Sequence, residues 1–113
     1  MAYDNRLEQR IDALAAPWPT LTKRKMFGGI GYLQQGNFTF GIWKRSLVVR
    51  CGPERQPALM GERFTSRFAV TGRPMKGWLL IDPQGFADQP ALQRWLTVGW
   101  EYASALPPKG MPE

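Results

Sequence analysis

Histidine is absent from this sequence of 113 residues, and cysteine occurs once, at Cys51. Without histidine the chain has no Ser-His-Asp triad, no Cys-His pair and no imidazole ligand for a metal ion. A single cysteine cannot form an internal disulfide or a thiolate-rich zinc site. We therefore expect no catalytic residue of these kinds, no metal and no cofactor.

Long apolar runs are also missing. No segment approaches the roughly 18 apolar residues that suggest a membrane-spanning helix. No early uninterrupted apolar stretch has the form of a secretory signal. The sequence therefore predicts a cytoplasmic protein that does not contact a membrane.

The composition is nevertheless sufficient for a folded core, with 43% hydrophobic and 12% aromatic residues. A chain of this size buries roughly two-thirds of the surface that it exposes when unfolded. We predict a single domain over residues 1–113, because no repeat or linker divides the chain. Residues 107–113 are rich in proline and glycine and are expected to form a flexible tail.

Positive charge is concentrated in the middle of the chain. The net charge is +6, but residues 23–76 hold 11 bases against two acids, whereas residues 1–22 carry −1 and residues 77–113 carry −2. Such a field favours an anionic partner, and solubilising charges on solvent-facing strand positions are the alternative. The strands about Lys25 and Lys44 are expected to be antiparallel neighbours. A single patch would comprise Lys23, Arg24, Lys25, Lys44, Arg45, Arg73 and Lys76.

The order of the periodic segments predicts an α+β fold. Apolar residues at helical spacing indicate one helix over about 4–16, capped by Asp4, and another that begins at Asp88 and ends before Pro107. β-forming residues between them indicate an antiparallel sheet of about five strands. The expected strands are 25–33, 38–44, 47–51, 64–71 and 78–81, with a short helix at 55–60. The N-terminal and C-terminal helices would pack on this sheet in two layers.

Two expectations concern the packing of apolar side chains. Trp95 and Trp100 are five residues apart and cannot share a helical face, so one is expected in the core and the other exposed or at an interface. The core itself is expected to bury a set of residues from both helices and three strands together. That set is Leu14, Phe40, Ile42, Val48, Leu80, Leu92 and Leu96.

Three glycines lie close together at Gly28, Gly29 and Gly31, directly after a basic segment. Their spacing does not fit the G-x-G-x-x-G phosphate loop, and strand-like residues rather than a helix follow them. We interpret them as permitting a bulge or a close backbone approach where the first helix crosses the sheet.

The segment Arg24-Lys25-Met26-Phe27-Gly28-Gly29 resembles the opening signature of the TfoX N-terminal domain family, also called TfoX/Sxy. The resemblance runs from about Leu7 to Leu106 and includes Pro74-Met75-Lys76-Gly77-Trp78 before a late strand. It implies an α+β domain and, for the best-known members of this bacterial family, regulation of natural competence together with the cyclic-AMP receptor protein. Those members carry a second, helical domain, and we expect this chain to be a stand-alone N-terminal domain. The resemblance implies no catalytic residues.

Other residues allow a functional and a structural interpretation. Cys51 follows Arg50, which could lower the thiol pKa, but a buried structural cysteine is the expectation. Asp82 and Asp88 could be paired carboxylates, but a turn start and a helix N-cap explain them better. Trp43 could stack on a nucleic-acid base or lie half-buried on the sheet.

Three classes of function remain open. The resemblance favours a non-enzymatic regulatory or protein-interaction domain, whose partners would include the transcription machinery or a second copy of the chain. The charge distribution permits a nucleic-acid-binding module of weak, sequence-independent affinity, because no base-reading motif is visible. A small enzyme would need Lys, Tyr or acidic catalysts that the sequence does not identify.

Overall fold

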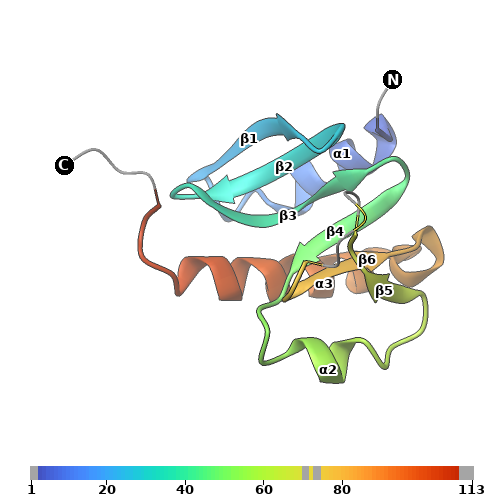
Figure 1. The fold of residues 1–113 in the computed structure, drawn as a ribbon. Helices are drawn as coiled ribbons and strands as arrows, with labels where there is room; N and C mark the ends of the chain where they lie inside the picture. The colour runs from blue at the N-terminus through green and yellow to red at the C-terminus, as the bar shows by residue number, and fades with distance from the viewer. Residues whose placement is uncertain (1–2, 70–71, 73–74, 110–113) are drawn as a thin grey trace.

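One antiparallel sheet forms the middle of the molecule, and both long helices lie on the same face of it (Figure 1). The computed structural model describes residues 3–69, 72 and 75–109. The described residues form six strands in the spatial order β1-β2-β3-β4-β6-β5, and each neighbouring pair is antiparallel. The predicted α+β two-layer architecture is thus confirmed. The strands are β1 (Leu21–Met26), β2 (Gly29–Gln34), β3 (Asn37–Trp43), β4 (Ser46–Arg50), β5 (Thr65–Arg67) and β6 (Trp78–Ile81).

Aspartate side chains cap the two long helices, as the sequence predicted. Asp4 accepts a hydrogen bond from the backbone N–H of Arg6 at 2.9 Å, and Asp88 accepts one from Ala91 at 2.8 Å. Each cap contributes about 1 kcal/mol of stability. No helix in the described part of the chain is long and apolar enough to cross a membrane. The helices are α1 (Asn5–Leu14), α2 (Gln56–Leu59), the 3₁₀ helix η1 (Pro83–Phe86) and α3 (Gln89–Ser104).

A tight turn at Phe27 and Gly28 divides the predicted strand 25–33 into β1 and β2. The two residues have positive φ angles of 41° and 79°, a pairing typical of two-residue hairpin turns. Because the chain reverses there, β2 lies between β1 and β3, and Ile30 is paired with Lys25 on one side. The expectation that the strands about Lys25 and Lys44 are neighbours is therefore wrong.

The larger hydrophobic cluster lies between the sheet and the helices and is called the helix-side core. Phe40 and Ile42 of β3 and Leu92 and Leu96 of α3 are fully buried in it, as predicted. Gly99 allows α3 to approach β3 closely, because an added Cβ there would collide with the backbone carbonyl of Thr39.

Val48 and Leu80 do not belong to the helix-side core, so the prediction of one common cluster is wrong for them. Their side chains lie in a second cluster on the opposite face of the sheet. Successive residues of a strand alternate between faces, and Leu47 of β4 takes the helix side instead. Leu14 packs against the helix-side core but is only partly buried.

The expectation for the two tryptophans of α3 is confirmed for Trp95 but not for Trp100, which is half-buried within the fold rather than exposed. Trp95 is buried in the helix-side core. Trp100 is half-buried and stacks on Trp18, which follows α1, with ring centroids 5.0 Å apart and planes inclined by 12°. This stacking fixes the segment after α1 against α3.

The predicted strand 64–71 is shorter in the structure, where β5 ends at Arg67. Phe64 precedes β5 with a φ of 65° and is exposed, whereas Phe68 is buried in the second cluster. Val70 and Thr71 of that prediction lie outside the described residues.

The start of the predicted flexible tail is hydrogen-bonded to the turn between β2 and β3. The amide of Asn37 donates to the carbonyl of Pro107 at 2.9 Å, and the backbone N–H of Lys109 donates to the carbonyl of Gln35 at 2.8 Å. The chain therefore remains attached to the sheet as far as Lys109. Residues 110–113 lie outside the described residues.

Candidate interaction surface

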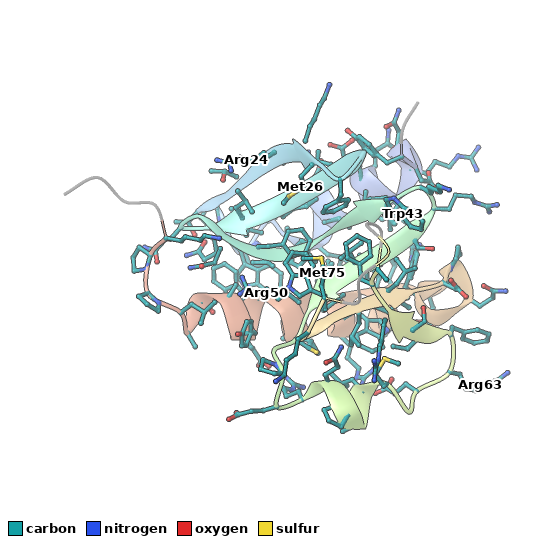
Figure 2. The ribbon with its side chains drawn as sticks, viewed as in Figure 1. Arg24, Met26, Trp43, Arg50, Arg63 and Met75 are labelled. Atoms are coloured by element: carbon teal, nitrogen blue, oxygen red, sulfur yellow. The ribbon has the colours of Figure 1, made fainter. Side chains whose placement is uncertain are left out.

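The face of the sheet turned away from the helices carries the second hydrophobic cluster, called here the open-face cluster. Figure 2 shows Met26, Trp43 and Met75 from three separate segments on this face. No described helix packs its buried residues against it, since those of α1, α2 and α3 contact the helix-side core. The cluster consists of Met26, Phe27, Leu33, Phe38, Trp43, Val48, Phe68, Met75, Trp78 and Leu80.

The aromatic rings of the open-face cluster are packed mainly against one another. Trp78 stacks on Phe38 with centroids 4.3 Å apart and planes inclined by 20°, and on Phe68 with centroids 6.0 Å apart. Phe27 sets its ring edge-on to Phe38 and Phe68. Such pairs stabilise by about 0.5–1.5 kcal/mol beyond their burial. The cluster is therefore a packed unit in which Leu33, Phe38, Val48 and Phe68 are buried, and its partly buried members provide the apolar surface that remains.

The family-like motif Met26-Phe27-Gly28-Gly29 helps to build the open-face cluster. The turn at Gly28 places Met26 and Phe27 on the open face. The absence of a side chain at Gly31 leaves room for the side chains of Met26 and Phe38. An added Cβ there would collide with Met26 and would lie 2.9 Å from the ring of Phe38. The expected close backbone approach is confirmed only at Gly29, where the backbone of Ile42 makes it rather than the first helix; Gly31 meets side chains, and no atom lies within 4 Å of an added Cβ at Gly28.

The seven predicted cationic residues do not share one face. Lys23 is directed to the helix side, where its ammonium lies 2.9 Å from a Glu8 oxygen and 2.8 Å from an Asp12 oxygen. Strand alternation places Lys25 on the same side as Lys23. Arg24 alternates with them and is exposed on the side of the open-face cluster.

Three of the other predicted cationic residues lie in turns at the ends of strands. Lys44 and Arg45 form the exposed turn between β3 and β4, with the Lys44 ammonium 4.7 Å from the centroid of the Trp43 ring. Lys76 is exposed in the turn before β6. Arg73 lies outside the described residues.

Acidic residues are segregated from the sheet. None of the six described strands contains Asp or Glu, so their ionisable charges are positive only. The described acids lie in helices, at helix caps or in connecting loops, and three of them pair there with Lys23 or Arg94. These acids are Asp4, Glu8, Asp12, Glu54, Glu62, Asp82, Asp88 and Glu101.

Arg50 is a residue of this surface that was not among the predicted cations. It ends β4 opposite Trp78, and its guanidinium carbon lies 5.7 Å from the centroid of the Trp78 ring and 5.3 Å from that of Tyr102. The alternation of Val48 and Arg50 along β4 was the available signal, because it places both side chains on one face.

The single cysteine is structural in its placement. Cys51 is 1% exposed, and its thiol lies 3.3 Å from the carbonyl oxygen of Gly52 and 3.5 Å from that of Gly77. Burial raises the pKa of the Cys51 thiol, and nearby Arg55 only partly opposes this effect. A cavity of about 470 Å³ lies beside it, and Arg55 and Glu101 at its edge pair with each other at 3.5 Å.

Comparison with known proteins identifies the family but no individual relative. Searches of the curated proteins and of the solved structures give no match. The model of the TfoX N-terminal domain matches residues 12–103, which include the hairpin turn at Gly28 and both faces of the sheet. This chain therefore belongs to the TfoX N-terminal domain family.

Proposed function

We propose that this chain is a non-enzymatic regulatory module that binds an acidic protein partner through the open-face cluster. The observation that carries the proposal is an apolar sheet face, without a covering helix among the described residues, on a sheet whose strands have positive charges only. Its composition also fits, because aromatic residues, Met and Arg are enriched at protein interfaces. Trp43, half-buried at the edge, is the type of residue that contributes most to binding energy.

The regulatory part of the proposal derives from the family. The resemblance to members that regulate natural competence suggests a cytoplasmic partner in the transcription machinery. The fold has room for such a contact without any change in the helix-side core, since the open-face cluster lies on the opposite side of the sheet.

A nucleic-acid-binding module is the second candidate, and the basic strands support it. Nucleic acids are held on aromatic platforms when bases stack on free ring faces. The rings of Phe38, Phe68 and Trp78 instead stack on one another. This arrangement favours a protein partner over a single-stranded nucleic acid.

Site-specific photocrosslinking in cells tests the proposal. A photoreactive residue is placed at Thr22 or at Ser66, both exposed and paired with Leu33 and Leu80 of the open-face cluster. The matched control position is Gln93, exposed on α3. We expect Thr22 and Ser66, but not Gln93, to yield protein adducts that nuclease treatment does not change.

Three results would contradict the proposal. Adducts that disappear with nuclease would assign the face to nucleic acid. Adducts of twice the mass of the chain would assign it to a second copy of the same protein. Equal yields from all three positions would show that the open face has no preferred partner.

A further inference from the structure

The guanidinium of Arg50 is held in place by aromatic rings from two elements. Trp78 lies beside it in β6, and Tyr102 comes from the last turn of α3, with ring centroids 5.7 and 5.3 Å from its central carbon. Arg50 is half-buried and lies at the edge of the open-face cluster (Figure 2). Cation–π contacts of this kind restrict the guanidinium without using its N–H groups.

Those N–H groups have no acceptor among the described residues. Two other arginines differ in this respect. Arg94 donates two hydrogen bonds to the carboxylate of Glu62, and Arg10 donates to the Gln89 side chain and to the carbonyl of Phe86. Arg50 is therefore an oriented but unused donor in a region whose strands carry no acid.

We propose that Arg50 is the carboxylate-binding anchor of the open face and that it receives an Asp or Glu side chain of the partner protein. The planar guanidinium presents paired donors that match the two oxygens of a carboxylate. Because the two cation–π contacts have already restricted the side chain, less conformational entropy is lost on binding. Apolar residues of the partner, adjacent to that carboxylate, would then contact Trp78 and the rest of the open-face cluster. This inference rests on the proposed function and adds its specificity.

The test uses the full chain and a hexaglutamate peptide with blocked ends as the acidic probe. Two matched variants, Arg50→Lys and Arg24→Lys, both preserve the net charge. Lysine retains the charge but loses the planar, paired donors of the guanidinium. We expect Arg50→Lys to weaken peptide binding by about fivefold or more, and Arg24→Lys by less than about twofold, because Arg24 is exposed and has no aromatic neighbour among the described contacts.

A second measurement requires no variant. The Nε–H resonance of Arg50 in the wild-type protein should shift on titration with hexaglutamate, and an equal concentration of sodium chloride should not reproduce the shift. Near-ultraviolet circular dichroism checks that Arg50→Lys retains the packing of Trp78. The titration of the wild-type resonance still tests the proposal if Arg50→Lys does not fold.

Three outcomes would contradict the proposal that Arg50 binds a carboxylate of the partner. Equal losses in both variants would mean that net charge alone attracts the peptide. An unchanged Arg50 resonance would mean that another group binds the carboxylate. Tighter binding of a thymidine oligonucleotide, lost in Arg50→Lys, would assign the residue to phosphate. In the first two cases, protein adducts at Thr22 and Ser66 would still support the docking face itself.

Discussion

The hydroxyl of Tyr32 donates a hydrogen bond to the Asp12 carboxylate at 2.7 Å and so joins β2 to α1. The Lys23 ammonium bridges Asp12 and Glu8 beside it and lies 5.4 Å from the centroid of the Tyr32 ring. Burial and the hydrogen bond to Asp12 raise the pKa of Tyr32 well above its usual value of 10.0. These contacts give α1 a polar attachment in addition to its two buried side chains, Leu7 and Ile11.

Replacing Tyr32 by Phe should lower the free energy of unfolding by about 1 kcal/mol near neutral pH, because one hydrogen bond is lost. It should also change the response to alkali. Tyr32 of the folded wild type stays neutral above pH 10.0, whereas the unfolded chain releases that proton. The stabilisation is thus complete below this pH and declines as the pH rises further.

Urea unfolding followed by tryptophan fluorescence at about pH 8 and about pH 11 measures both effects. Wild type should lose more stability than Tyr32→Phe between these two pH values. Lys23, whose pKa is also raised, is present in both proteins and acts in the same direction in each. Parallel losses in the two proteins would show that Tyr32 does not ionise differently on unfolding.

Truncation of Leu96 tests the helix-side core. Leu96 is fully buried against the sheet, so Leu96→Ala should cost about 2–5 kcal/mol through lost burial and a residual cavity. The matched control is Leu106→Ala, because Leu106 lies just beyond α3 and is half-buried. This substitution should lower the free energy of unfolding by less than about 1 kcal/mol. A loss below about 1 kcal/mol for Leu96→Ala in denaturant titration would mean that the register of α3 is wrong.

Sequence periodicity was sufficient to predict the two long helices and the strand residues that face them. Asp4 and Asp88 gave clear capping signals, and the alternation of Phe40 and Ile42 with small or polar residues indicated a strand, although β3 is buried on both faces rather than half-buried. The sequence did not predict the hairpin turn between β1 and β2, because Phe27 adopts a positive φ that is uncommon for a bulky residue.

The candidate surface was less accessible to prediction because both faces of the sheet are apolar. Val48 and Leu80 have the same residue types as helix-side positions, so composition alone could not assign their face. The acid-free middle segment was visible in the sequence. The division of its bases between two faces depended on the register of β1, which separates Lys23 and Lys25 from Arg24.

Two alanine substitutions should show what the glycines of the family motif do. Gly28 has a φ of 79° and no atom within 4 Å of an added Cβ, so Gly28→Ala should cost only backbone strain, about 1–2 kcal/mol. An added Cβ at Gly29 would collide with the backbone carbonyl oxygen of Ile42, which cannot move without separating β2 from β3. Gly29→Ala should therefore cost more than about 3 kcal/mol.

Thermal unfolding of the two motif variants measures the difference. The midpoint of Gly29→Ala should fall well below that of Gly28→Ala, or Gly29→Ala should fail to fold. Similar midpoints would show that β2 and β3 adjust to the extra carbon. In that case the close approach at Gly29 would not explain the second glycine of the motif.

The last prediction concerns the predicted cationic patch and separates its members by their contacts. Any affinity for single-stranded DNA should be weak and independent of sequence, and its logarithm should fall linearly with the logarithm of the salt concentration. Each lost phosphate contact should flatten that slope by about 0.7.

Lys25→Gln should flatten the slope in this way, because Lys25 is exposed and has no ion-pair partner among the described residues. Lys23→Gln should leave the slope nearly unchanged, because Glu8 and Asp12 already neutralise its ammonium. Equal slopes for both variants would mean that this ion pair opens on DNA, and tight binding to one defined sequence at physiological salt would favour direct DNA recognition over protein docking.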